Sequence, residues 1–201
     1  TSLKCHFNQL TSLDVSANTA LTTLECSSNQ LTSLDVSANT ALTILKCHFN
    51  QLTSLDVSSN TALTRLSVEG NEITSLDVSY NTNLINLGLN YNELTSLDLS
   101  GATALTTLNC SSNSLSYLNM KNGVTDQLTT FSATTNSLNC IEVQNPDWAT
   151  ANWTSADGHI DSGVSFAVCC SSTDVSNWHV ATHGSDTHVC GYQGSPFATI
   201  Q

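Results

Sequence analysis

The chain has little positive charge: its 201 residues include four Lys and Arg against 16 Asp and Glu, for a formal net charge of −12. Phosphate recognition needs a basic face, so this balance argues against a nucleic-acid partner. It also disfavours binding to anionic membrane surfaces. Apolar residues form no run near the roughly 18 residues that a membrane span needs, so we expect no membrane insertion.

A signal peptide is also missing. The chain opens at Thr1-Ser2-Leu3, inside a repeat, and we therefore expect a mature fragment or an excised domain. Eight cysteines are many for a cytosolic protein of this size, which favours an oxidising compartment. Charged residues make up only 10% of a chain rich in Ser, Thr and Asn, a bias compatible with disorder, but regularly spaced leucines argue for a folded chain.

Two short units alternate along the chain. The first reads Leu-Glu-Cys-Ser-Ser-Asn-Gln-Leu from Leu24 and recurs about every 21 residues, at Leu3, Leu45, Leu66, Leu87 and Leu108. A seventh copy, residues 131–138, follows a two-residue slip near Asn122-Gly123. The second unit has a Leu-Asp-Val core at Leu13, Leu34, Leu55 and Leu76, with related cores at Leu97 and Leu118. Internal repeats of this length indicate a solenoid.

Apolar residues alternate within each unit, as in Leu24 and Cys26, with the period of a β-strand. Each turn is predicted to carry two short strands, and stacking in register would form two parallel sheets at about 4.8 Å per turn. We therefore predict a mainly β fold, a solenoid of stacked parallel strands with little helix. Each turn cannot bury its apolar residues alone, so the turns share one core. In one turn these residues are Leu21, Leu24, Cys26, Leu31, Leu34 and Val36.

Two rows of Asn are predicted to satisfy buried backbone groups where the chain turns. The first row is Asn8, Asn29, Asn50, Asn71, Asn92 and Asn113, and the second is Asn18, Asn39, Asn60 and Asn81. Ala102 interrupts the second row, and we expect a looser turn there.

The run Leu-x-x-Leu-x-Cys-x-x-Asn-x-Leu resembles the leucine-rich repeat consensus. The variant Leu-Thr-Ser-Leu-Asp-Val-Ser-x-Asn-Thr-Ala resembles the 21-residue repeats of secreted bacterial surface proteins, and the segment from Leu138 to Phe166 resembles their C-terminal cap. The resemblance implies a secreted or cell-surface protein that binds a ligand or another protein. It divides the chain into repeats over residues 1–138 (about seven turns), a cap over 139–170 and an unassigned cysteine-containing tail over 171–201.

The cap can also be interpreted from its residues. Asn145 and Pro146 suit the N-cap and the first turn of a helix, so a short helix is predicted to begin there. Trp148 and Trp153 would then cover the end of the core, where an uncovered coil exposes apolar surface and an unpaired strand edge.

The eight cysteines fall into two sets. Cys5, Cys26, Cys47 and Cys110 share one inward position, which Val68 and Leu89 occupy in the intervening turns. Exchange with Val and Leu indicates an apolar slot, so we predict free buried thiols rather than metal ligands. Cys140, Cys169, Cys170 and Cys190 lie in the irregular end region and are disulfide candidates. The resemblance implies that Cys140 pairs with Cys169 or Cys170, and Cys190 could take the other.

No cofactor is expected, although two sets of residues are weak candidates for metal binding. His179, His183 and His188 have spacing compatible with zinc, but their segment does not read as a helix and lacks the His-Glu-x-x-His motif, so surface histidines are favoured. Calcium is the alternative for an outward row on the second sheet, namely Asp14, Asp35, Asp56, Asp77 and Asp98.

The Asp row is expected to titrate as a coupled set, with some apparent pKa values raised by like charges. Neighbouring charges at about 4.8 Å repel by about 3.5 kcal/mol at an effective dielectric constant of about 20. Solvation, hydrogen bonds from neighbouring Ser and Thr, or bound cations would have to relieve this repulsion. The nearly identical environments of the five carboxylates argue against paired catalytic acids.

The outward positions of the first strand row are where the repeats differ most. Variable side chains on a constant frame are typical of a recognition face, with neutral drift of a solvated surface as the alternative. The predicted ligand-binding residues are Lys4, His6, Phe7, Glu25, Lys46, His48, Phe49, Arg65, Glu69, Asn90 and Tyr91. We predict a binding module for a protein or a surface glycan. A structural spacer or adhesin stalk is the second interpretation, and an ice-binding array of Ser and Thr is the third, which the charged Asp row disfavours.

Aromatic residues recur on this face. Phe7, Phe49 and Tyr91 occupy the same repeat position in alternate turns, about 9.6 Å apart. Ser28, Gly70 and Ser112 stand between them. Such rings could stack on alternate sugars of an extended glycan or anchor a protein partner, and the alternative is that each ring covers only its own loop. No Ser-His-Asp arrangement, Gly-rich phosphate loop or zinc-protease signature appears in the sequence, so no enzyme activity is predicted.

Overall fold

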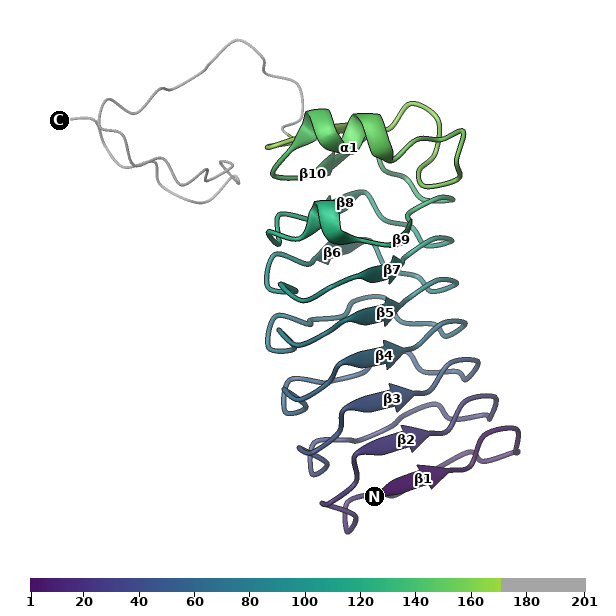
Figure 1. Ribbon diagram of the computed structural model, residues 1–201. Helices are drawn as coiled ribbons and strands as arrows, with labels where there is room; N and C mark the ends of the chain where they lie inside the picture. The colour runs from purple at the N-terminus through teal and green to yellow at the C-terminus, as the bar shows by residue number, and fades with distance from the viewer. Residues whose placement is uncertain (171–201) are drawn as a thin grey trace, which may run out of the picture.

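The computed structural model describes residues 1–170. They form one stack of turns, with the N-terminus at one end and helix α1 (Pro146–Asn152) at the other (Figure 1). A parallel sheet of seven strands runs along one side, in the order β1-β2-β3-β4-β5-β7-β9. Its strands are β1 (Ser2–Lys4), β2 (Thr23–Glu25), β3 (Ile44–Lys46), β4 (Arg65–Ser67), β5 (Asn86–Gly88), β7 (Thr107–Asn109) and β9 (Thr130–Ser132). Leu24 pairs with Leu3 on one side and Leu45 on the other, so the repeat period sets the register of the sheet.

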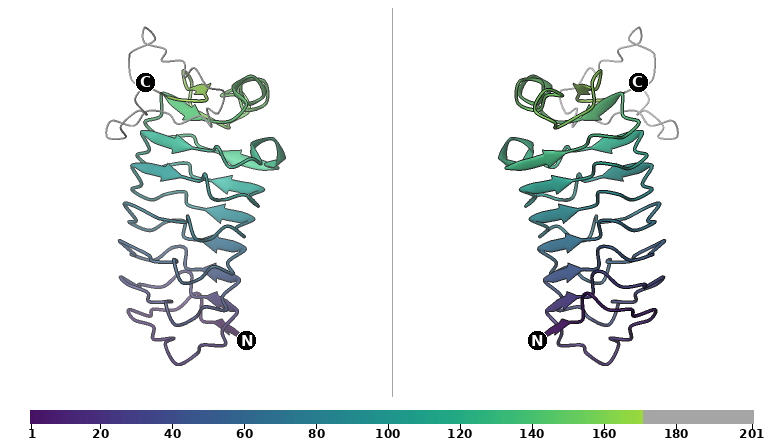
Figure 2. Two further views of the ribbon diagram at one scale, coloured as in Figure 1. Left: turned by 90° about the vertical axis from the view of Figure 1, so that its left-hand side faces the viewer. Right: turned by 90° about the vertical axis from the view of Figure 1, so that its right-hand side faces the viewer.

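The opposite side of the stack carries strands only toward the C-terminal end (Figure 2). Four strands form this second parallel sheet, in the order β11-β10-β8-β6. They are β6 (Ser96–Asp98), β8 (Tyr117–Asn119), β10 (Cys140–Glu142) and β11 (Ser165–Ala167). The prediction of two strands in every turn was therefore wrong for the first four turns, whose second units form no strand.

Asparagine side chains explain this difference. In the early turns, Asn39 Nδ2 donates hydrogen bonds to the carbonyls of Val15 at 3.0 Å and Asn18 at 2.9 Å. Asn60 and Asn81 repeat these bonds one and two turns further on. Because side-chain amides link the turns here, the second units are held without a backbone ladder. Strand pairing begins at β6, in the turn where Ala102 replaces the Asn.

The core matches the prediction from the repeat. All six inward positions of the second turn are buried, from Leu21 to Val36, and the same positions are buried in the following turns except at Leu76 and Leu128, which are partly buried. The first Asn row also bonds as predicted. Asn50 Nδ2 donates to the carbonyls of Cys26 and Cys47, and Asn50 Oδ1 accepts from the Leu31 N–H at 3.0 Å. From Asn29 to Asn113, each Asn of this row ties its own turn to the preceding one.

The C-terminal end is closed as the sequence predicted. Asn145 caps α1 by accepting the Trp148 N–H at 3.0 Å, and Pro146 is the first residue of the helix. Trp153 is 3% exposed and packs against Phe131, with ring centroids 4.1 Å apart. A 3-10 turn, η1 (Thr125–Gln127), takes up the two-residue slip after Asn122. No helix among residues 1–170 has the length and apolar character to cross a membrane.

Candidate binding surface

The outward side of the seven-stranded sheet is the surface whose residues change from turn to turn. We call it the variable sheet. It comprises the outward positions in and just after each strand, represented by Ser2, Lys4 and His6 in the first turn, together with the next residue, represented by Phe7. Their side chains face away from the core because the inward position between them is the buried Leu or Cys of the repeat.

Charges at the N-terminal end of the variable sheet pair with one another. Glu25 lies between the turns that carry Lys4 and Lys46, and its Oε1 is 3.4 Å and 3.1 Å from the two ammonium nitrogens. The hydrogen bond from Lys46 is the largest cause of a lowered pKa at Glu25. Three of the predicted ligand residues therefore form an internal network, which fixes their side chains and neutralises much of their charge.

Two histidines in the same repeat position each lie near a glutamate. His6 Nδ1 is 3.9 Å from Glu25 Oε2, and His48 Nδ1 is 3.9 Å from Glu69 Oε2. The two atoms of the second pair are buried and have no hydrogen-bond partner.

Further along, the variable sheet has polar and apolar side chains open to solvent. Arg65 is exposed and forms no ion pair with any residue of the described part of the chain. The nearby Ile85 side chain is 39% exposed, and Asn90 is half-buried in the same turn as Tyr91. An unpaired cation beside an exposed aliphatic side chain leaves this middle part of the sheet free to contact a partner.

The three aromatic residues at the edge of the variable sheet are largely exposed. Phe7 is 79% exposed, Phe49 57% and Tyr91 63%. All three have a left-handed backbone, with φ of 56°, 54° and 58°. The position is left-handed in the intervening turns too, where Ser28, Gly70 and Ser112 stand. Neither burial nor backbone preference explains aromatic side chains here, because bulky residues rarely adopt this conformation.

The row of aspartates contradicts one expectation. The backbone N–H of Ser16 donates to Asp14 at 2.9 Å, and this bond together with the Ser16 hydroxyl lowers the pKa of Asp14. The serine two residues later lowers the pKa in the same way in the next three turns, at Asp35, Asp56 and Asp77. For these four aspartates the prediction of raised pKa values was wrong, because local hydrogen bonds outweigh the repulsion between exposed carboxylates. Calcium between these residues stays a prediction.

The cysteines divide as predicted. Among the described residues, Cys5, Cys26, Cys47 and Cys110 are free, and all but Cys5 are buried. Burial raises the pKa of Cys26 and Cys110 to about 12 and that of Cys47 well above its usual value. Cys140 forms a disulfide with Cys170, and Cys169 is disulfide-bonded as well. Cys190 lies outside the described residues.

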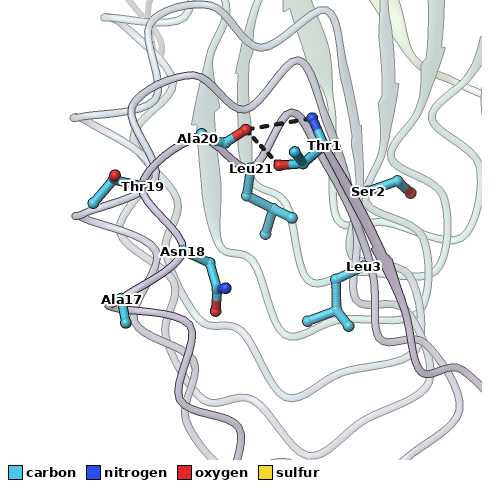
Figure 3. A pocket seen from close by; sticks show the side chains of 8 residues that line it. All are labelled: Thr1, Ser2, Leu3, Ala17, Asn18, Thr19, Ala20 and Leu21. Carbon is cyan, nitrogen blue, oxygen red and sulfur yellow. Dashed lines mark hydrogen bonds between the residues drawn. The ribbon is translucent and has the colours of Figure 1, made fainter.

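Neither of two surface hollows within residues 1–170 brings catalytic groups together. The larger, of about 420 Å³, lies at the open N-terminal end between Leu3 and Leu21, where Thr1 hydrogen bonds to the Ala20 carbonyl (Figure 3). Only aliphatic, hydroxyl and amide side chains line it. The second, of about 210 Å³, lies between η1 and α1 and contains one carboxylate, Asp126.

Metal ligands are not clustered in the described part of the chain. Residues 1–170 contain no group of three or more His, Cys, Asp or Glu side chains that could hold a metal ion. The zinc candidates His179, His183 and His188 lie outside the described residues.

Sequence reasoning missed one buried ion pair. Lys121 Nζ is 2.8 Å from Glu142 Oε2, and Glu142 is 5% exposed. The second carboxylate oxygen of Glu142 accepts the Cys170 N–H at 3.3 Å. The pair therefore joins the last repeat to the cap disulfide. The signal in the sequence was Lys121 itself, one of only four Lys and Arg in a strongly acidic chain.

Comparison with known proteins gave matches among solved structures only: no protein-family model matches the chain, and no curated protein matches its sequence. The functional domain of InlJ from Listeria monocytogenes, which includes a cysteine ladder, is 40% identical over 73% of this chain and 35% of that chain, with a TM-score of 0.66. The LRR protein LIC12759 of Leptospira interrogans is 28% identical over 70% of this chain and 38% of that chain, with a TM-score of 0.65.

A more distant match comes from a plant. The LRR ectodomain of the receptor kinase GASSHO1/SCHENGEN3 from Arabidopsis thaliana, in complex with CASPARIAN STRIP INTEGRITY FACTOR 2, is 24% identical with a TM-score of 0.62. It matches 69% of this chain and 19% of that chain. The chain thus spans well under half the length of each of these three proteins, and the plant match concerns the fold alone.

Proposed function

We propose that this leucine-rich repeat protein is a recognition module that binds a partner protein through the variable sheet, outside the cell or at its surface. One observation carries the proposal: outward residues of the variable sheet differ between turns whose core and turn residues are nearly constant. Packing and turn geometry do not restrict those outward positions, so they are available for contacts with a partner.

The middle of the variable sheet suits a protein partner best. Arg65 and Ile85 lie there with Asn86 and Asn90, and a mixture of an arginine, exposed apolar groups and amides is typical of protein interfaces. Lys4 and Lys46 are instead held by the single carboxylate of Glu25, which leaves them less free to contact a partner. We therefore place the centre of the interface on β4 and β5 rather than on β1 to β3.

One solved structure of this fold contains a bound partner. A receptor ectodomain of this fold has been solved in complex with CASPARIAN STRIP INTEGRITY FACTOR 2, so the fold is able to present a surface to such a partner. The described residues offer no pairing of a nucleophile with a base in either hollow, which favours binding over catalysis. Paired cap cysteines agree with an oxidising, extracellular location.

Site-specific photocrosslinking tests the proposal. A benzophenone amino acid replaces Arg65 or Asn86 on the variable sheet and, as matched controls, the exposed Ser54 or Ser75 on the opposite side. Each variant is incubated with surface and secreted proteins of the source culture, and crosslinked products are identified by mass spectrometry. We expect the same partner at both variable-sheet positions and not at the two control positions. Equal crosslinking on both sides, or crosslinking from the serines alone, would refute it.

A further inference from the structure

A second ligand is indicated by the edge of the variable sheet. We propose that Phe7, Phe49 and Tyr91 form a stacking ladder for a neutral, extended β-1,4-linked glycan. This ligand is additional to the protein partner, whose interface we centre on β4 and β5, and it is recognised by different side chains.

The rings are presented at regular intervals and in the same way. Their backbone φ values agree within a few degrees, at 56°, 54° and 58°. His6 lies edge-on to Phe7 at a centroid distance of 5.3 Å and 83°, and His48 lies edge-on to Phe49 at 5.4 Å and 82°. Turns repeat at about 4.8 Å, so rings in alternate turns are about 9.6 Å apart and the three rings span about 19 Å.

The intervening small residues keep this spacing. A Cβ at Gly70 would lie 2.5 Å from Phe49 Cδ1, so the Phe49 ring lies across the next turn, where a side chain would displace it. Ser28 and Ser112 occupy the position of Gly70 in the turns after Phe7 and Tyr91. The Phe49 ring therefore lies over two turns, and the small serines after Phe7 and Tyr91 leave those two rings largely exposed.

The period of the ladder fits a glycan with alternating sugar faces. In an extended β-1,4-linked chain each sugar is turned over relative to its neighbour, so every second sugar presents the same face, and two sugars are about as long as two turns of the solenoid. An aromatic ring stacks on the C–H face of a sugar while the sugar hydroxyls remain free for hydrogen bonds.

Polar residues flank every ring in the sequence. The residue before each ring is His6, His48 or Asn90, and Gln9, Gln51 or Glu93 follows two residues after it. Amides and imidazoles donate and accept hydrogen bonds, as sugar hydroxyls do. The local cations Lys4 and Lys46 are paired with Glu25, and the net charge of the chain is −12, so a neutral glycan is favoured over an acidic one.

Calorimetric titration of the whole chain with chito-oligosaccharides and cello-oligosaccharides of two to six sugars tests the proposal. Three sugars reach two rings and five reach three, so affinity should rise at three sugars, rise again at five and then level off. Malto-oligosaccharides of the same lengths are the control, since their α-linkages coil the chain away from a straight ladder. The chitin and cellulose series separate the two sources of the shared β-1,4 chemistry.

Glycine replacements separate binding from packing, because Gly70 already occupies the ring position in one turn. Phe49→Gly and Tyr91→Gly should each weaken binding of the five-sugar ligand by about five- to tenfold without lowering the melting temperature. Tyr80→Gly, at a 60% exposed tyrosine in the turn after the second unit, should leave binding unchanged.

Three outcomes would overturn the proposal. One is absence of binding by both β-linked series at millimolar concentration. Another is equal affinity for the α-linked series. The third is a loss of several degrees of stability in the glycine variants with unchanged glycan affinity, which would make the rings packing groups. If the parent chain binds no glycan and the ring variants lose crosslinking at Arg65, the rings belong to the protein interface instead.

Discussion

At the scale of single residues, the inward cysteines behave as small apolar groups. Cys26, Cys47 and Cys110 are fully buried and reduced, in a slot that Val68 and Leu89 fill elsewhere. Because Cys, Val and Leu share this inward position in different turns, the position requires a side chain that fills space and is apolar.

Replacing Cys26 tests that requirement. Cys26→Val should cost less than about 1.5 kcal/mol of unfolding free energy, because it nearly conserves volume. Cys26→Asp should unfold the neighbouring turns, since an unpaired charge cannot be buried there. Chemical denaturation followed by circular dichroism gives both values. A Val variant as unstable as the Asp variant would show that the thiol makes a specific interaction.

The thiols also predict a loss of stability in alkali. Burial raises the pKa of Cys26 and Cys110 from 9.0 to about 12, so their contribution is complete below about pH 9 and is lost as the pH rises toward 12. The unfolded chain ionises its thiols first and gains free energy from doing so. A variant with Val at Cys26, Cys47 and Cys110 should lose less stability than the parent chain over this range. Parallel curves for the two proteins would contradict the assignment.

At the scale of structural elements, hydrogen bonds from Asn side chains join the turns. Asn50 bonds to the carbonyls of Cys26 and Cys47 and to the Leu31 N–H while it is 8% exposed. Asn8 occupies the same position at the open end, is exposed, and its side chain bonds only within its own turn. The two residues form a matched pair that differs in burial and in the link between turns.

Asn50→Ala should therefore destabilise the chain far more than Asn8→Ala. Each buried backbone group left unpaired costs about 1–3 kcal/mol, whereas water replaces the bonds lost at Asn8. Urea denaturation measures both changes in unfolding free energy. Similar values for the two variants would indicate that the Asn row contributes little to cohesion between turns.

Sequence reasoning succeeded where the repeat restricts the residues. The inward position of Leu24, the bonding of Asn50 and the cap helix at Pro146 follow from periodicity and capping rules, and the structure agrees. The repeat did not predict that the second units of the early turns lack strands, nor that the pKa of Asp14 is lowered. Both features depend on which local hydrogen bonds form. The Glu25 network was missed for a related reason: partners in it are 21 residues apart and vary independently.

At the scale of the whole molecule, the chain is a stack whose two ends differ. The cap closes one end with Trp153 packed on Phe131 and with the Cys140–Cys170 disulfide, while Leu3 at the other end is only half-buried. Neighbour contacts dominate in such a stack, so unfolding proceeds from the weaker end.

Trp153→Ala should convert the cap into a second weak end. Truncating a buried aromatic residue costs about 3–5 kcal/mol, and the loss falls on the turns around Phe131. Hydrogen exchange should show faster exchange in β9 and β10 and unchanged exchange in β2 and β3. Uniformly faster exchange along the chain would mean that the stack unfolds as one cooperative unit.

The central claim is that recognition belongs to the variable sheet and stability to the constant frame. Ile44→Thr with Arg65→Thr tests it most directly, because Thr23 and Thr107 already occupy the same repeat position. The measurement is the affinity of this variant for the partner captured at Arg65, compared with that of Ser33→Ala and Ser54→Ala on the opposite side. We predict a loss of about tenfold or more for the first variant and less than about twofold for the second, with equal melting temperatures. Unchanged affinity in the first variant, or a larger loss in the second, would contradict the account.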